Sequence, residues 1–136
     1  MNALFKAIYT HFGLIPGSGF YNDIGGRMYL NIAPQEATFP YCVYFQVTDD
    51  HEMNFSDDQE EFEIQFNIFT KDFDATEAGT LLESLKTMFD FCVLNVVGWS
   101  HLNFQRTMVL TNNDFAQVPP IQGYSVMYDV LLERQR

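Results

Sequence analysis

The side chains best suited to chemistry lie between Asp49 and Glu63, a stretch with eight carboxylates and neither lysine nor arginine. Oxygen ligands at positions 1, 3, 5, 9 and 12 of a loop bind calcium. The residues with that spacing are Asp50, Glu52, Asn54, Asp58 and Glu61. Position 6 is Phe55, where a calcium loop needs glycine for a sharp turn. We therefore predict a long acidic loop between two strands, either solvated or partner-binding, and no metal ion.

No other pattern in the chain points to catalysis. His11, His51 and His101 are isolated from one another, and no serine motif or metal-ligand spacing surrounds them. The glycine-containing stretches 16–19 and 25–26 match neither a phosphate-binding loop nor a dinucleotide fingerprint, so we interpret them as turns. We expect a protein that is not an enzyme and has no catalytic, cofactor-binding or metal-binding residues.

The composition is that of an acidic protein with a large apolar core. Asp and Glu number 18 against 7 Lys and Arg, for a formal charge of −11, while 47% of the residues are hydrophobic and 16% aromatic. The apolar share excludes a disordered acidic tail, and the charge excludes general binding to a phosphate backbone. No apolar run is long enough to span a membrane. The length predicts a single domain, residues 1–136.

The N-terminus indicates an intracellular protein, and the two cysteines are expected to be free. Lys6 lies inside the first apolar stretch rather than before it, which differs from a signal peptide. We therefore expect an unprocessed, intracellular start. Cys42 and Cys92 have apolar neighbours and no zinc-type spacing, so we predict buried free thiols.

Apolar periodicity predicts seven elements in the order α-β-β-β-α-β-β. They cover residues 2–12, 27–32, 41–47, 61–68, 74–89, 102–110 and 124–132. Asp74 and Glu77 have the spacing of a capping box at the start of the second helix. No strand–helix–strand unit repeats, so we predict an α+β fold in which two helices pack on one face of a mostly antiparallel sheet.

Strand 102–110 contains one irregularity. Simple alternation places Arg106 on the same face as Phe104, Met108 and Leu110. A cation on an apolar face indicates either a carboxylate partner or a break in the alternation, and both alternatives stay open.

The aromatic residues fall into two groups. Phe62, Phe66 and Phe89 lie on apolar stripes and are predicted to form the core. Other aromatics stand among polar loop residues, where they either anchor the loop or contact a partner. The candidate interface or lumen residues are Asp49, Asp50, Glu52, Phe55, Asp57, Asp58, Glu60, Glu61, Phe73 and Phe115.

Two stretches of the sequence resemble a known family. The first is Gly25-Gly26-Arg27-Met28-Tyr29 followed by Ala33-Pro34 and by Ala37-Thr38-Phe39-Pro40-Tyr41-Cys42-Val43-Tyr44. The second is Glu61-Phe62-Glu63-Ile64-Gln65-Phe66-Asn67-Ile68-Phe69-Thr70, which leads into the second helix. With the closing Gln122-Gly123-Tyr124 strand, these motifs resemble the small tail-completion proteins of long-tailed phages and prophages. The resemblance is to the tail terminator or head-to-tail joining type.

That resemblance implies a non-enzymatic structural protein of the virion tail, assembled in the host cytoplasm. Such a protein forms a homo-oligomeric, hexameric ring that ends the tail tube, and its partners are the tail tube protein and the head connector protein. DNA would pass through without specific binding, and no cofactor or membrane is implied. Carboxylates that line the lumen would repel phosphates, so we expect the residues around Asp49–Glu61 to face it.

A different class of function also fits the residues. The chain could be a monomeric protein-binding module whose acidic loop docks a basic partner. The mass of the protein in solution separates this alternative from the ring.

Overall fold

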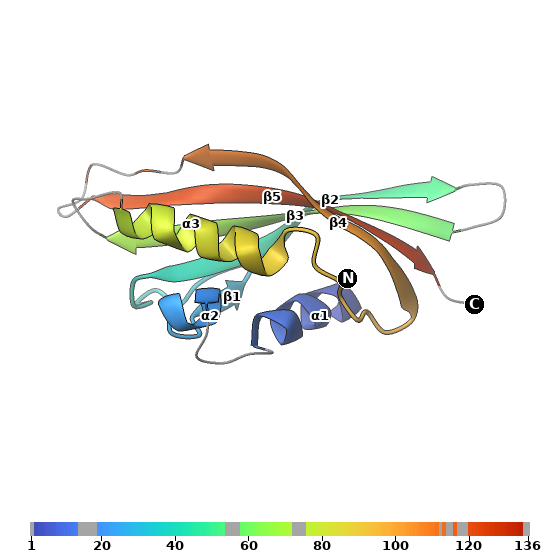
Figure 1. Ribbon diagram of the computed structural model, residues 1–136, viewed down its shortest axis with the longest axis horizontal. Coiled ribbons are helices and arrows are strands. Elements are labelled where there is room, and N and C mark those ends of the chain that lie inside the picture. The colour runs from blue at the N-terminus through green and yellow to red at the C-terminus, as the bar shows by residue number, and fades with distance from the viewer. Residues whose placement is uncertain are drawn as a thin grey trace.

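The chain folds into a sheet with helices on one of its faces (Figure 1). The computed structural model describes residues 2–13, 19–53, 58–71, 76–111, 113, 116 and 120–134. In these residues the elements are α1 (Asn2–Gly13), α2 (Gly19–Asp23), β1 (Met28–Leu30), β2 (Tyr41–Met53), β3 (Asp58–Lys71), α3 (Thr76–Phe89), β4 (Trp99–Thr111) and β5 (Ile121–Arg134). The strand order is β1-β2-β3-β5-β4, and every pairing is antiparallel except that of β1 with β2. The predicted α+β class, with its mostly antiparallel sheet, is confirmed.

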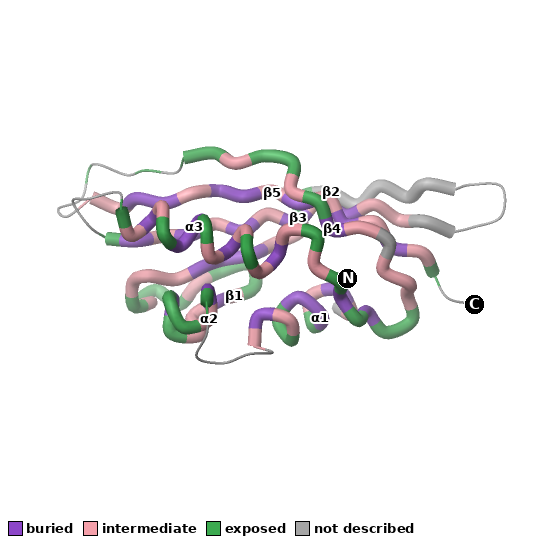
Figure 2. The backbone as a smooth tube through the Cα atoms, in the orientation of Figure 1, coloured by how far each residue is buried: buried purple, intermediate pink, exposed green. Residues whose placement is uncertain are grey.

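The central strand, β3, has one face buried under the helices and one face that is partly exposed to solvent. Its residues alternate strictly between buried and half-buried from Glu61 to Thr70, as Figure 2 shows along the strand. Phe62, Ile64 and Phe66 are fully buried beneath the helices. The sequence has the period of two that such a half-covered strand requires. We call the side of the sheet opposite the helices its open face.

Aromatic rings fill the centre of the core. The Phe66 ring lies 4.7 Å from that of Phe89 in α3 and 5.7 Å from that of Tyr128 in β5. Phe104 of β4 lies 4.9 Å from Tyr128 and 5.9 Å from Phe89, measured between ring centroids. Each such side chain contributes about 1.5–3 kcal/mol by leaving water. Residues from α3, β3, β4 and β5 therefore meet in one cluster, as predicted for Phe62, Phe66 and Phe89.

The two longer helices bury the stripes that their sequences predict. In α1 the stripe is Leu4, Ala7, Ile8 and Phe12, all buried. In α3 the stripe is Ala78, Leu81, Leu82, Leu85, Met88 and Phe89, all buried except Met88, which is half-buried against the core. The proposed cap, Asp74, lies outside the described residues. No helix in the described part of the chain is long and apolar enough to cross a membrane.

A short third helix was missed by the sequence prediction. We expected only turns on either side of this region, yet α2 forms between them and buries Phe20, with Ile24 buried directly after it. Gly25 and Gly26 follow with φ values of 59° and 74°, a conformation that favours glycine and ends the helix. One helical turn with two apolar anchors is too short to produce a periodic signal.

The predicted acidic loop is wrong in its extent. β2 continues to Met53 and β3 begins at Asp58, so most of the acidic segment is an antiparallel ladder. The alternation that predicts a strand is absent from residues 48–53, because nearly all of them are polar. Residues 54–57, between the two strands, lie outside the described part of the chain.

The predicted apolar face of β4 is also wrong beyond Arg106. The pairing with β5 shifts between Arg106 and Met108, which is a β-bulge. After this extra residue the faces exchange, so Met108 and Leu110 are 49% and 51% exposed while Val109 packs on the core. Both alternatives for Arg106 hold, because it also pairs with a carboxylate, Asp90, at 3.2 Å.

Candidate functional site

The strand register divides the acidic segment between the two faces of the sheet. Glu61 and Glu63 lie on the open face, at alternate positions to the buried Phe62 and Ile64. Glu60 lies on the helix side and forms an ion pair of 3.8 Å with Arg134. The expectation that these carboxylates form one surface is therefore wrong for Glu60.

The remaining predicted site residues are placed less completely. Asp49, Asp50 and Glu52 belong to β2, where they pair in register with Phe62, Glu61 and Gln59. Asp58 pairs with Met53 at the end of β3. The predicted contact residues Phe55, Asp57, Phe73 and Phe115 lie outside the described residues.

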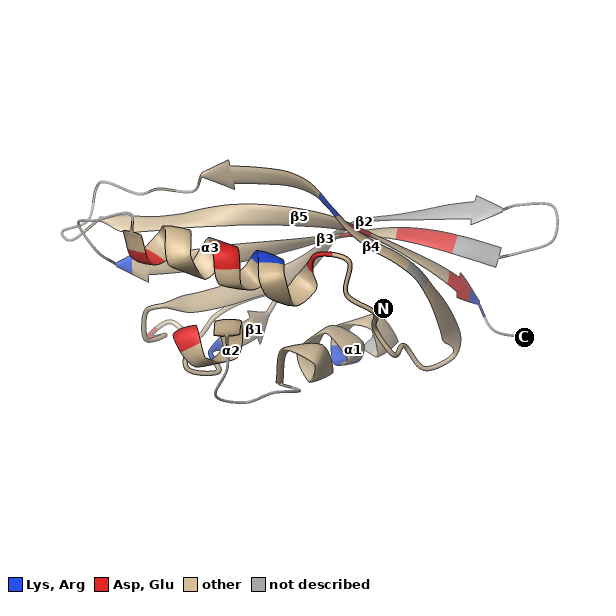
Figure 3. Cartoon of the chain, in the orientation of Figure 1, with Lys and Arg blue, Asp and Glu red and all other residues tan. Residues whose placement is uncertain are grey.

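The structure adds two carboxylates that the sequence prediction missed. Asp129 of β5 pairs with Glu63, and Glu133 pairs with Gln59, so both stand beside the β3 carboxylates on the open face. Figure 3 shows the acidic first part of β3 and the acidic end of β5. The period of β5 marks Asp129 and Glu133 as polar, but only the cross-strand register brings them next to β3. We call Glu61, Glu63, Asp129 and Glu133 the carboxylate cluster.

The opposite end of the open face is aromatic. The Tyr41 ring lies 5.2 Å from Phe69, 5.1 Å from Phe39 and 6.1 Å from Tyr29, between centroids. Lys71 places its Nζ 5.8 Å from the centre of the Phe39 ring, a cation–π contact. Burial, with Tyr29 nearby, raises the pKa of Tyr41. The open face thus changes from aromatic to acidic along the strands.

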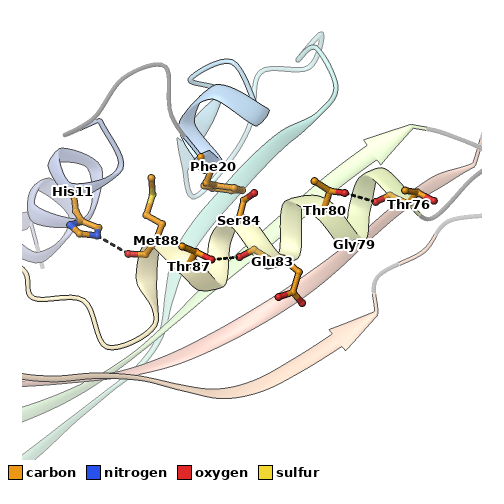
Figure 4. A pocket seen from close by; sticks show the side chains of 10 residues that line it. His11, Phe20, Thr76, Gly79, Thr80, Glu83, Ser84, Thr87 and Met88 are labelled. Atoms are coloured by element: carbon orange, nitrogen blue, oxygen red, sulfur yellow. Dashed lines mark hydrogen bonds between the residues drawn. The ribbon is translucent and has the colours of Figure 1, made fainter.

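A groove crosses the helical layer beside α3 (Figure 4). Its volume is about 800 Å³, and its lining is mostly apolar. The lining residues are His11, Gly19, Phe20, Thr76, Gly79, Thr80, Glu83, Ser84, Thr87 and Met88.

The polar groups of this groove already have partners within the chain. His11 Nε2 lies 2.8 Å from the Met88 carbonyl oxygen, and Ser84 Oγ donates to Asp23 Oδ2 at 2.6 Å. A catalytic serine instead needs a histidine base within hydrogen-bond reach. The hydrogen bonds of the described residues place His11 on a backbone carbonyl and Ser84 on a carboxylate. They do not form a serine–histidine pair.

A second polar cluster ties the end of α3 to the sheet. The Tyr128 hydroxyl donates to Asp90 Oδ1 at 2.6 Å, and Arg106 Nη1 lies 3.2 Å from Asp90 Oδ2. Burial and the Asp90 carboxylate raise the pKa of Tyr128 far above its ordinary value. Because a phenol that stays protonated remains a donor, this cluster is structural.

Burial disfavours the charged forms of the two thiols and of His101. Cys42 is fully buried and Cys92 half-buried, and burial raises the pKa of Cys92 to about 12. His101 has a pKa lowered by burial, and its Nε2 has no hydrogen-bond partner among the described residues. The described part of the chain contains no group of three or more His, Cys, Asp or Glu side chains able to hold a metal ion.

This geometry defines an α+β fold with helices on one face of a mostly antiparallel sheet. No protein-family model matches the sequence, and no curated protein matches it. The fold is similar to that of a chain in a solved structure described as "Virion of native gene transfer agent (GTA) particle". The TM-score is 0.76 at 10% sequence identity, over 97% of this chain and 96% of that chain. At this identity the similarity concerns the fold.

Proposed function

We propose that this chain is a non-enzymatic structural protein of phage tail assembly. In this proposal it forms a hexameric ring that terminates the tail tube and joins it to the head connector. The observation that carries the proposal is the fold match to a chain of a virion particle over nearly the full length of both chains. The sequence motifs that resemble tail-completion proteins support it independently of the fold.

The distribution of charge supports a passage for DNA. The carboxylate cluster lies on the open face of the sheet, where no helix of the described chain covers it. In a ring whose open faces line the lumen, these side chains would repel the phosphates of DNA that passes through. The partners in this proposal are further copies of the chain, the tail tube protein and the head connector protein, in the tail of the virion.

The second candidate is a monomeric protein-binding module. The groove beside α3 favours it, because its polar groups are satisfied internally and its lining is mostly apolar. Such a groove suits an apolar segment of a partner better than a polar small molecule. A monomer at every concentration, together with binding to a single partner, would favour this candidate.

The test of the proposed function is a stop codon in the gene within the phage or prophage genome that carries it. We expect electron microscopy to show DNA-filled heads and unjoined tails, and expression of the wild-type chain to restore joined particles. Complete, infectious particles without the chain would overturn the proposal.

A further inference from the structure

The sheet has open edges at both ends of its strand order. β4 is the last strand on one side. On the other side, β1 pairs only with Cys42–Tyr44 of β2, and no other described strand pairs with β2 further along that side. The first half of β4 is already covered, because the Phe104 carbonyl accepts from Phe91 N of the same chain at 3.0 Å. We call residues 47–53 the β2 edge and residues 107–110 the β4 edge. Exposed edge strands present backbone donors and acceptors to another chain.

The directions of the two edges match each other. Three antiparallel pairings separate β2 from β4, namely β2–β3, β3–β5 and β5–β4. β4 therefore runs opposite to β2. If a second copy extends the sheet in the same orientation, its β2 edge meets the β4 edge of the first copy in the antiparallel arrangement. This is slightly the more stable kind of pairing.

The charges of the two edges favour pairing of a β2 edge with a β4 edge over pairing of two β2 edges. The β2 edge contains Asp49, Asp50 and Glu52, whereas β4 contains no carboxylate along its whole length. Contact between two β2 edges would bring like charges together, which is destabilising. Contact between a β2 edge and a β4 edge avoids that repulsion.

Exposed apolar side chains lie on both edges. Met108 and Leu110 on β4 are 49% and 51% exposed, and Val47 on β2 is 40% exposed. When the two edges align antiparallel, Leu110 at the end of one comes opposite Val47 at the start of the other. Burial of these side chains would add a hydrophobic contribution to the backbone hydrogen bonds.

We propose that a second copy of this chain docks its β2 edge on the β4 edge, and that this head-to-tail contact, repeated, closes the ring. The inference deepens the proposed function, on which it rests, by naming the surfaces that join the subunits. A heterologous contact of this kind forms a ring when its rotation closes. The sheets of neighbouring copies then form one continuous wall with their open faces on the same side.

Cysteine cross-linking tests the contact directly. The variants are Val47→Cys, Leu110→Cys and the double variant, each treated with a short bismaleimide, with the wild-type chain as the background for Cys42 and Cys92. We expect a ladder of dimers, trimers and larger species from the double variant alone. Each single variant should match the wild type, because a head-to-tail contact never brings two copies of one position together.

A charge variant with a matched control provides the second measurement. Met108→Glu with Leu110→Glu places like charge against the β2 edge and should weaken self-association by roughly tenfold or more. Val93→Glu with Val97→Glu makes the same charge change at sites that are 77% and 82% exposed, in the segment between α3 and β4 and outside the residues of both edges, and should leave association unchanged. Thermal unfolding confirms that all variants fold.

The outcomes separate this inference from the proposed function. Dimers from Leu110→Cys alone would show β4–β4 pairing and overturn the inference. Oligomers detected by light scattering, with no cross-linked ladder, would also overturn the inferred contact. The proposed ring would then form through other surfaces. A chain that is monomeric at the highest attainable concentration and gives no ladder would overturn both the contact and self-assembly.

Discussion

The cluster that joins α3 to the sheet allows a quantitative test with Tyr128→Phe. The hydroxyl of Tyr128 donates to Asp90 Oδ1 at 2.6 Å, while its fully buried ring packs against Phe66 and Phe104 at 5.7 and 4.9 Å. Phenylalanine keeps the ring and removes only the donor. The substitution therefore isolates one hydrogen bond between β5 and the residue that follows α3.

The expected loss follows from the environment of the carboxylate. A hydrogen bond to a charged group contributes about 1.5–3 kcal/mol. The Asp90 side chain is 25% exposed and keeps its ion pair with Arg106, so water and the guanidinium compensate part of the loss. We expect the free energy of unfolding to fall by about 1.5 kcal/mol, which corresponds to a decrease in Tm of roughly 5 °C.

Urea unfolding at neutral pH measures the effect. The matched control is Tyr9→Phe, which removes the same atom from a side chain that is 49% exposed and should change the free energy of unfolding by less than about 0.5 kcal/mol. Asp90→Asn completes a double-mutant cycle that assigns the loss to this pair. If Tyr128→Phe is as stable as Tyr9→Phe, the hydrogen bond does not hold α3 to the sheet and our reasoning is wrong.

Four further predictions concern stability and charge. Gly123→Ala should destabilise the protein by roughly 2 kcal/mol or more in urea unfolding, because a Cβ there overlaps the β3 backbone. Gly79→Ala, in an open helical position, should stabilise it by about 0.5–1 kcal/mol; equal effects would contradict both. Because burial lowers the folded-state pKa of His101, the unfolded state binds the proton more readily, so stability should fall as pH decreases below about 6.5. In thermal scans His101→Leu should reduce this slope, and an unchanged slope would refute the assignment. Asp129→Lys with Glu133→Lys should create salt-sensitive DNA retention that the wild type lacks, measured by filter binding; no retention at low salt would count against the electrostatic argument.

Much of the fold follows from local pattern. The strict alternation from Phe62 to Ile68 identifies the central strand, and the stripe from Ala78 to Phe89 identifies the longest helix. Both signals are strong because each element buries one side only and is long enough for its period to show.

The errors come from features that lack a local pattern. Residues 48–53 alternate little in polarity, so their membership of β2 depends on pairing with β3. The bulge before Met108 reverses the faces of β4. A single extra residue does not change the composition of the strand, so the sequence does not reveal the bulge.

The candidate surface was predictable only in part. Glu61 is on the open face as expected, whereas Glu60 is on the helix side because successive strand residues point to opposite faces. Asp129 and Glu133 join the cluster through the register of β5 on β3, which sequence alone does not specify.

Cryo-electron microscopy of particles from the phage or prophage that encodes this chain tests the central claim most directly. We predict a closed ring of this chain between the tail tube and the head connector, with Glu61, Glu63, Asp129 and Glu133 on the channel side. A particle without this chain at that junction would contradict the claim, and so would a ring with these carboxylates on its outer rim.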